Sequence, residues 1–426
     1  MVRTAGHWFL ALLLTPVLTG MGSAAPAREI TWYTWPWTAE EQQEWNERLA
    51  AFTAQTGIKV NVINLISGTG YEQKLLLLFA AGDVPDVIHL RGQREFPMMG
   101  SMHAVLDLTP YLKQTTLPIR DYATSMLRST QWEGEQIALP SSAGSYLAMY
   151  NVDQFNRFGL NPPGIDWTWD DVLFLSRKLT VDRNGDGTPE QYGLFVPDYA
   201  WEEMVLSAGI PPLKGDGTFN WNNLTVREML QFWVDLFTKE KIVNRNWDGF
   251  LSGKQAIFLE GTWSIPDREH PPDFTWDTAV MPRWRDLPHG TELIVHGYAI
   301  PKAAKNPDDA FRFIEWLASR ERILGEFNEG NVSTELVPDR VIMARNLQVL
   351  GELAPRLPET LLWTIEHGFQ LPRPSWYIGD QNYWSIEYIG QALAGTMSVP
   401  TALELTERQF NALVAAGASW TYKPQE

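Results

Sequence analysis

The chain has 426 residues, with 51 Asp or Glu against 34 Lys or Arg, so its formal net charge is −17. This acidic balance disfavours nucleic acids and anionic membranes as partners, because both bind basic surfaces. The absence of cysteine excludes disulfides, thiolate metal sites, a cysteine nucleophile and a lipid anchor on cysteine. The length predicts two or three globular domains.

The N-terminus is typical of a secretory signal peptide. Arg3 precedes an apolar run over residues 8–18, and small residues follow as far as Ala27. The apolar run is shorter than the roughly 20 residues that a membrane span needs. We therefore expect residues 1–27 to be removed and the mature protein to be soluble and periplasmic or otherwise extracytoplasmic.

Strands and helices are predicted to alternate in the mature chain. Strands are expected at 29–35, 59–66 and 87–90, and helices at 38–57 and 71–81. This order predicts a parallel sheet with helices on both faces, in which ligands bind beyond the carboxyl ends of the strands. Trp35 and Trp37 follow the first strand, in a loop that Pro36 keeps out of regular pairing. Both are therefore candidates for ligand contact, and core packing is the alternative.

Eight short motifs, spread over nearly the whole mature chain, carry a family resemblance. They are residues 56–60 (TGIKV), 71–75 (YEQKL), 80–87 (AAGDVPDV), 150–155 (YNVDQF), 159–163 (GLNPP), 168–171 (TWDD), 261–263 (GTW) and 391–393 (QAL). In their order and spacing, the chain resembles the family 1 extracellular solute-binding proteins of ATP-binding-cassette (ABC) importers, the maltose-binding-protein type.

The resemblance implies an α/β, two-lobed periplasmic-binding-protein fold. Each lobe would be a mainly parallel sheet flanked by helices, and a hinge of two or three crossing segments would join the lobes around the ligand. Segments 137–149, 283–296 and 330–338 contain the turn residues expected of such crossings. Lobe 1 would then comprise 28–140 and 290–331, and lobe 2 would comprise 141–289 and 332–426.

One loop matches the first half of an EF-hand calcium site. Its candidate ligands are Asp182, Asn184, Asp186, Thr188 and Glu190. Gly187 stands where the sharp turn needs glycine, but Gly193 replaces the bidentate glutamate of a complete EF-hand. We expect a structural Ca²⁺ here and no cofactor for chemistry. The alternative is an ordinary turn, since Asp, Asn and Gly are common turn residues.

The candidate ligand-binding residues combine aromatic rings with planar hydrogen-bonding groups. Sugars offer C–H faces for stacking and a rim of hydroxyls, so a sugar site needs both kinds of side chain. Segments similar to those that line the cleft of sugar-binding relatives supply Trp35, Trp37, Arg91, Gln93, Arg94, Tyr199, Trp201, Trp263, Arg373, Trp376, Tyr383 and Trp384. Four other tryptophans at helical spacing are predicted to be core, namely Trp45, Trp233, Trp316 and Trp363.

The resemblance implies a monomeric transport receptor, not an enzyme, with a mono- or oligosaccharide ligand and the transmembrane permease subunits of an ABC importer as partners. An anionic ligand, such as a sugar phosphate or glycerol phosphate, is a second possibility, because three of the candidates are arginines: Arg91, Arg94 and Arg373. The default expectation is that these arginines pair with nearby acidic side chains. A secreted glycoside hydrolase is the alternative from another class. It needs two carboxylates across the scissile bond, and no motif singles out such a pair. A lectin would normally be all-β.

Overall fold

The computed structural model describes residues 28–64, 69–197, 200–266, 271–328, 335–369 and 388–415. The predicted signal peptide lies outside these residues and stays a prediction. Within the described ranges, the structure contains no helix with the length and apolar character of a membrane span.

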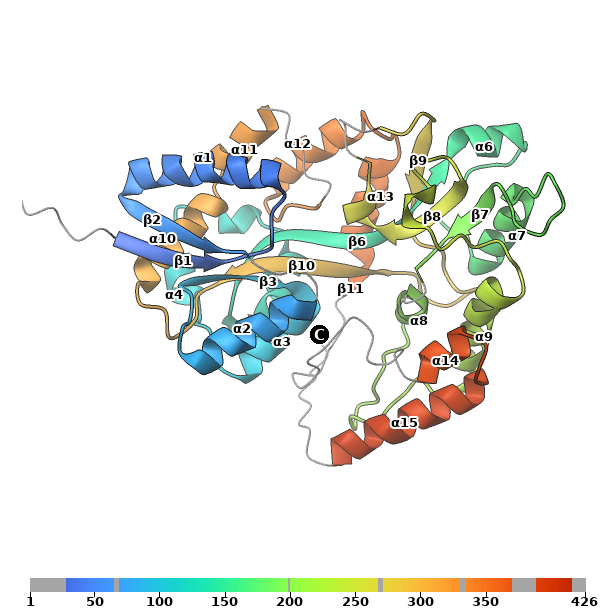
Figure 1. The fold of residues 1–426 in the computed structure, drawn as a ribbon. Helices are drawn as coiled ribbons and strands as arrows, with labels where there is room; N and C mark the ends of the chain where they lie inside the picture. The colour runs from blue at the N-terminus through green and yellow to red at the C-terminus, as the bar shows by residue number, and fades with distance from the viewer. Residues whose placement is uncertain are drawn as a thin grey trace, which may run out of the picture.

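The first half of the molecule follows the predicted alternation. The elements are β1 (Arg28–Tyr33), α1 (Ala39–Thr56), β2 (Ile58–Ile63), α2 (Thr69–Ala81) and β3 (Val87–Arg91). Strand β1 lies between β2 and β3 and pairs with both in parallel, while α1 lies on one side of this sheet and α2 on the other (Figure 1). Helix α1 starts with a capping box between Thr38 and Glu41 and ends at Gly57, whose φ of 72° is left-handed.

Two long strands connect the halves of the sheet (Figure 1). They are β6 (Leu139–Asn151) and β10 (Thr291–Ala299), and the strand order is β2-β1-β3-β10-β6-β8-β7. Both strands run antiparallel to their neighbours on this path. They overlap the segments 137–149 and 283–296, which were predicted as the first two crossings. The lobe boundaries and the crossings themselves stay a prediction. The mixed sheet and its many helices confirm the predicted α/β class.

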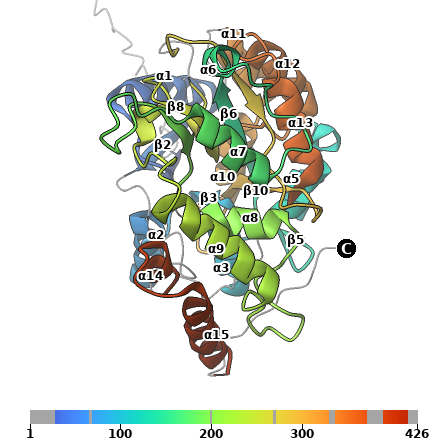
Figure 2. The same ribbon diagram turned by 90° about the vertical axis from the view of Figure 1, so that its right-hand side faces the viewer.

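The second half is built on β7 (Tyr192–Phe195), β8 (Gln255–Gly261) and β9 (Trp276–Ala279). Helix α9 (Leu224–Thr238) packs against α8 (Trp201–Ser207), α14 (Gly390–Leu393) and α15 (Val399–Ala415), as Figure 2 shows. The helix α7 (Trp169–Leu179) begins at a capping box between Thr168 and Asp171.

The remaining elements cover the faces and ends of the sheet. They are α3 (Gly92–Ser101), α4 (Thr109–Leu112), α5 (Thr124–Ser129), β4 (Gln131–Trp132), β5 (Glu135–Gln136), α6 (Val152–Arg157), α10 (Pro307–Leu317), α11 (Arg320–Asn328), α12 (Arg340–Leu350), α13 (Leu357–His367) and β11 (Gly368–Phe369).

The tryptophans predicted as core do pack in the core. Trp233 and Trp363 are buried in the second half of the molecule. Trp45 and Trp316 are partly buried and pack against the core of the first half. The helical spacing of these residues was therefore a sound guide to which indoles face inward.

Candidate functional site

The candidate site lies on one face of the sheet, where β10 pairs with β3 and β6. His296 of β10 lies between Arg91 of β3 and Ser142 of β6, and Ile294 lies opposite Gly144. Because alternate residues of paired strands share a face, these five residues point to the same side of the sheet. Three strands that are far apart in sequence thus contribute to one surface.

Trp35 forms an aromatic platform at one end of this surface. Its ring stacks on Tyr71 with centroids 5.0 Å apart, and it makes edge-to-face contacts with His89 at 4.9 Å and His296 at 5.5 Å. The Arg91 guanidinium lies 5.1 Å from the Trp35 ring centre and 5.5 Å from that of Tyr71, at cation–π distance. Trp35 is half-buried, so part of the indole remains available to a ligand.

Arg91 is compensated by two buried carboxylates. Its Nε lies 3.4 Å from Glu95, and a terminal nitrogen lies 3.9 Å from Glu72. The pairing expected by default is therefore confirmed for this arginine. With 28% of its side chain exposed, Arg91 still offers N–H groups to a hydroxyl.

The two histidines are held as neutral imidazoles. Burial is the main cause that lowers the pKa of His89, followed by the charges of His296 and Arg91. Burial also lowers the pKa of His296, although Glu335 opposes this shift. Nε2 of His89 lies 3.1 Å from the Ser141 hydroxyl, which fixes the ring beside β6. Neutral imidazoles suit hydrogen bonding to hydroxyls without attracting a charge.

Trp263 forms a second platform on the same face. It follows β8 in the 3₁₀ turn Thr262–Ser264, is 42% exposed and meets Tyr146 edge-on at 5.4 Å. Its ring lies over Gly144 and Gly261, because a Cβ added to these residues would come within 3.3 Å and 2.2 Å of it. Gly144 lies under Trp263, and Ser142, two residues away on the same face, is paired with His296, which contacts Trp35. Two residues of a strand span roughly 7 Å, so the residues that support the two platforms are roughly 7 Å apart along the strands.

Buried carboxylates lie at the far end of the surface. Oε1 of Glu203 on α8 accepts a hydrogen bond of 2.9 Å from the backbone N–H of Glu292 on β10. Burial, and then the charge of Glu292, raise the pKa of Glu203 to about 8. Glu260 is buried in β8 opposite Leu147, on the other face of the sheet from Gly144, and accepts from the Gly261 N–H at 3.0 Å.

Two other predicted ligand-binding tryptophans pack inward: Trp201 lies in the core and Trp37 packs against the core. Trp201 is fully buried and packs edge-on against Trp221, so its indole lies where no ligand can reach it. Trp37 stacks on Trp45 with an angle of 7° between the rings and also contacts Trp32. Periodicity cannot tell whether a tryptophan in a loop or at a helix start turns inward or faces a ligand.

The other candidates are not located by the structure. Gln93 and Arg94 lie in the first turn of α3, but their side chains fall outside what the structure describes. Five further residues lie wholly outside the described ranges, namely Tyr199, Arg373, Trp376, Tyr383 and Trp384. All seven stay predictions.

The calcium-like loop is closed by its own hydrogen bonds. Asp182 accepts from the backbone N–H groups of Gly185 and Gly187 at 2.8 and 2.9 Å, and Glu190 accepts from that of Arg183 at 2.8 Å. Within the described ranges, no three His, Asp or Glu side chains are grouped so as to hold a metal. The carboxylates thus act as turn-closing acceptors in this structure, and calcium binding stays a prediction.

Sequence reasoning missed His296, Gly144 and Tyr146 as parts of the site. Residues 144 and 296 are 152 positions apart, and only the register of β6 with β10 brings them together. Tyr71 had a signal, since it opens one of the family motifs, but its role as the support of Trp35 depends on tertiary packing.

A family model shows the family of the chain, and solved structures show its fold. Residues 35–322 match the model of the bacterial extracellular solute-binding proteins. The arabinooligosaccharide-binding protein of Bacillus subtilis is 23% identical over 73% of this chain and 75% of its own length. A Listeria monocytogenes ABC substrate-binding protein in complex with cycloalternan has a TM-score of 0.77 at 22% identity, covering 91% and 99% of the two chains. Maltose-bound MalE3 of T. maritima has a TM-score of 0.74 at 19% identity, covering 91% and 100%.

Proposed function

The chain belongs to the bacterial extracellular solute-binding proteins, and on this premise we propose that it captures a neutral mono- or oligosaccharide and delivers it to an ABC importer. The family is one of binding proteins, which favours capture over chemistry. The relatives described above bind an arabinooligosaccharide, cycloalternan or maltose, which supports a carbohydrate as the ligand class. Export through cleavage of residues 1–27 belongs to the same proposal.

The observation that carries the proposal is the pair of tryptophans on one face of the sheet. Indole rings stack on the C–H faces of sugars and exclude water from them. Between the two platforms lie Arg91, Ser142 and His296, which are partly accessible and can donate or accept hydrogen bonds from a rim of hydroxyls. A surface of flat rings and neutral or compensated polar groups suits a sugar.

The charges favour a neutral sugar over a sugar phosphate. Arg91 is already neutralised by Glu72 and Glu95, so it has little attraction left for a phosphate. A receptor for an anionic sugar derivative would instead need an uncompensated cation on this surface.

The proposed mechanism is closure about β6 and β10. Trp35 belongs to the half built on β1 to β3, and Trp263 follows β8 in the other half. A sugar that contacts both rings binds the closed arrangement more tightly than the open one and shifts the population towards it. The importer's permease subunits would then bind the closed form of a monomeric receptor.

The test is a binding screen with a matched control. The mature protein is titrated by calorimetry with neutral sugars, neutral oligosaccharides and sugar phosphates, each with and without calcium. We expect saturable binding of one neutral class, loss of affinity in Trp263→Ala, and unchanged affinity in Trp247→Ala, whose indole is 43% exposed at another place.

Two results would overturn the proposal. Binding of sugar phosphates alone would show that Arg91 acts as an anion receptor despite its carboxylate partners. Release of shorter sugars would show that the protein is a glycoside hydrolase. Chromatography of the sugar after incubation detects such products, whereas a receptor returns its ligand intact.

A further inference from the structure

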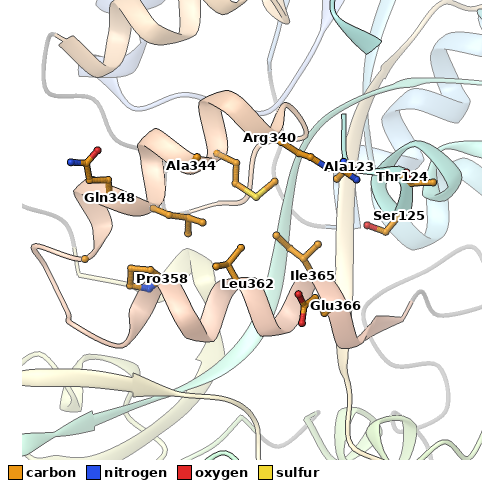
Figure 3. A pocket seen from close by; sticks show the side chains of 13 residues that line it. Ala123, Thr124, Ser125, Arg340, Ala344, Gln348, Pro358, Leu362, Ile365 and Glu366 are labelled. Carbon is orange, nitrogen blue, oxygen red and sulfur yellow. The ribbon is translucent and has the colours of Figure 1, made fainter. Parts of the chain in front are cut away.

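A groove between α12 and α13 lies outside the proposed sugar site. Its volume is about 720 Å³, within the range of small-molecule sites. The apolar lining includes Met343 and Leu347 of α12 and Leu362 and Ile365 of α13 (Figure 3). Leu362 is 47% exposed, which is unusual for a leucine that faces a cavity. None of the predicted ligand-binding residues lines this groove.

Both ends of the groove are closed, so it fits a small molecule better than a helix of a partner protein. Residues 123–125, at the start of α5, stand at one end. At the other end Gly351 and Pro358 meet, and a Cβ on Gly351 would lie only 3.2 Å from the Pro358 ring. A helix long enough to bury its apolar face would need to pass through one of these ends.

Two opposite charges lie at the α5 end of the groove. Arg340 of α12 and Glu366 of α13 both line it there, together with the hydroxyls of Thr124 and Ser125 (Figure 3). Within the described residues, neither charge takes part in an ion pair or hydrogen bond. The neighbouring Asp339 is already bound to Arg320 at 2.7 Å and so is not available to Arg340.

We propose that this groove binds a small amphipathic zwitterion, a molecule with a hydrocarbon body and a head that carries one negative and one positive charge. The hydrocarbon lies on Met343, Leu347 and Leu362, which removes the exposed leucine from water. The negative group of the head pairs with Arg340 and the positive group with Glu366. A simple anion would be repelled by Glu366 and a simple cation by Arg340.

The test uses three probes with the same ten-carbon chain, each below its micelle-forming concentration. They are decylphosphocholine, decanoate and decyltrimethylammonium, titrated into the full mature protein by calorimetry. We expect decylphosphocholine to bind one molecule per chain, at least about tenfold more tightly than either singly charged probe. Arg340→Gln and Glu366→Gln should each weaken it about tenfold, the size of one charged hydrogen bond.

Three controls locate the binding. Ala344→Trp places a large ring on an exposed position of the groove and should abolish binding without disturbing the core. Arg312→Gln removes an exposed arginine on α10 and should have no effect. Trp263→Ala should also leave the affinity unchanged, because the groove does not depend on the proposed sugar site.

The proposal is wrong if no probe binds saturably, or if Ala344→Trp and the two charge variants all bind decylphosphocholine like the parent protein. Decanoate that binds as tightly as the zwitterion, with no response to Glu366→Gln, would also overturn it, in favour of a site for simple anions. Loss of decylphosphocholine binding in Trp263→Ala would show that the probe binds the proposed sugar site instead. That result would also overturn the proposal.

Discussion

The two tryptophan platforms are held in different ways. Trp35 lies among other rings and under a guanidinium, so its position is fixed by attractive contacts with Tyr71, His89 and Arg91. Trp263 lies on two glycines, and the space for its ring exists because neither glycine has a Cβ. The contrast shows that one platform is part of its lobe's packing, whereas the other is supported mainly by bare backbone. Substitution of Trp35 should therefore lower stability, whereas substitution of Trp263 should lower ligand affinity alone.

The largest expected effect is that of Trp35→Ala. The loss of a half-buried indole with four aromatic or cationic neighbours should lower the free energy of unfolding by about 3 kcal/mol and also weaken sugar binding. Urea unfolding and calorimetry on the same sample measure both quantities. Trp35→Phe serves as the control, since it keeps a ring on Tyr71 and should recover most of the stability. Unchanged stability in the alanine variant would show that Trp35 is only a ligand contact.

Trp263→Ala should lower affinity and spare the fold. The indole is 42% exposed and makes one ring contact among the described residues, with Tyr146. We expect sugar binding to weaken by more than about 1 kcal/mol, while the free energy of unfolding changes by less than about 1 kcal/mol. Calorimetry and urea unfolding provide the two numbers. A larger loss of stability than in Trp35→Ala would reverse the contrast between the platforms.

Gly261→Ala tests whether the bare backbone sets the position of Trp263. A Cβ at this position would lie 2.2 Å from the indole, so the ring must move. We expect affinity to fall about tenfold, which is 1.4 kcal/mol, without any loss of a ligand-contacting group. Tryptophan fluorescence during sugar titration reports the movement of the ring. Gly164→Ala is the control, since nothing lies within 4 Å of an added Cβ there.

The pH dependence of stability should reveal the carboxylates at the far end of the surface. The folded protein raises the pKa of Glu203 from 4.5 to about 8, so the folded state holds a proton that the unfolded state releases above 4.5. This stabilising contribution is complete below pH 4.5 and is lost as the pH rises to about 8. Between pH 6 and 7, the free energy of unfolding should fall by on the order of 1 kcal/mol.

Glu203→Gln should flatten this slope, because the amide does not ionise and its oxygen can still accept from the Glu292 N–H. Urea unfolding at several pH values measures the slope in both proteins. Parallel curves for the two would show that Glu203 is ionised in the fold and that some other group carries the slope.

The sequence predicted the first half of the fold better than the site. Strand and helix periodicity located β1 to β3 with their helices, and the segments predicted as the first two crossings overlap β6 and β10. The sequence pattern did not separate inward-facing tryptophans from ligand-facing ones. It therefore placed Trp201 and Trp37 at the ligand, although Trp201 is buried in the core and Trp37 packs against the core. The meeting of Gly144 with Trp263, and of His296 with Trp35, depends on strand register between distant segments, which no local signal encodes.

Gly144→Ala should have the smallest effect, and it tests how strongly the position of Trp263 depends on each of its two glycines. Its added Cβ would lie 3.3 Å from the indole, a contact that a shift of a few tenths of an ångström relieves. Affinity should therefore fall only about twofold, roughly 0.4 kcal/mol, while Gly261→Ala costs about tenfold. The same order should hold for the fluorescence change of Trp263. A larger loss in Gly144→Ala than in Gly261→Ala would mean that the ligand itself touches β6 at Gly144, and that the glycine serves the sugar and not the tryptophan.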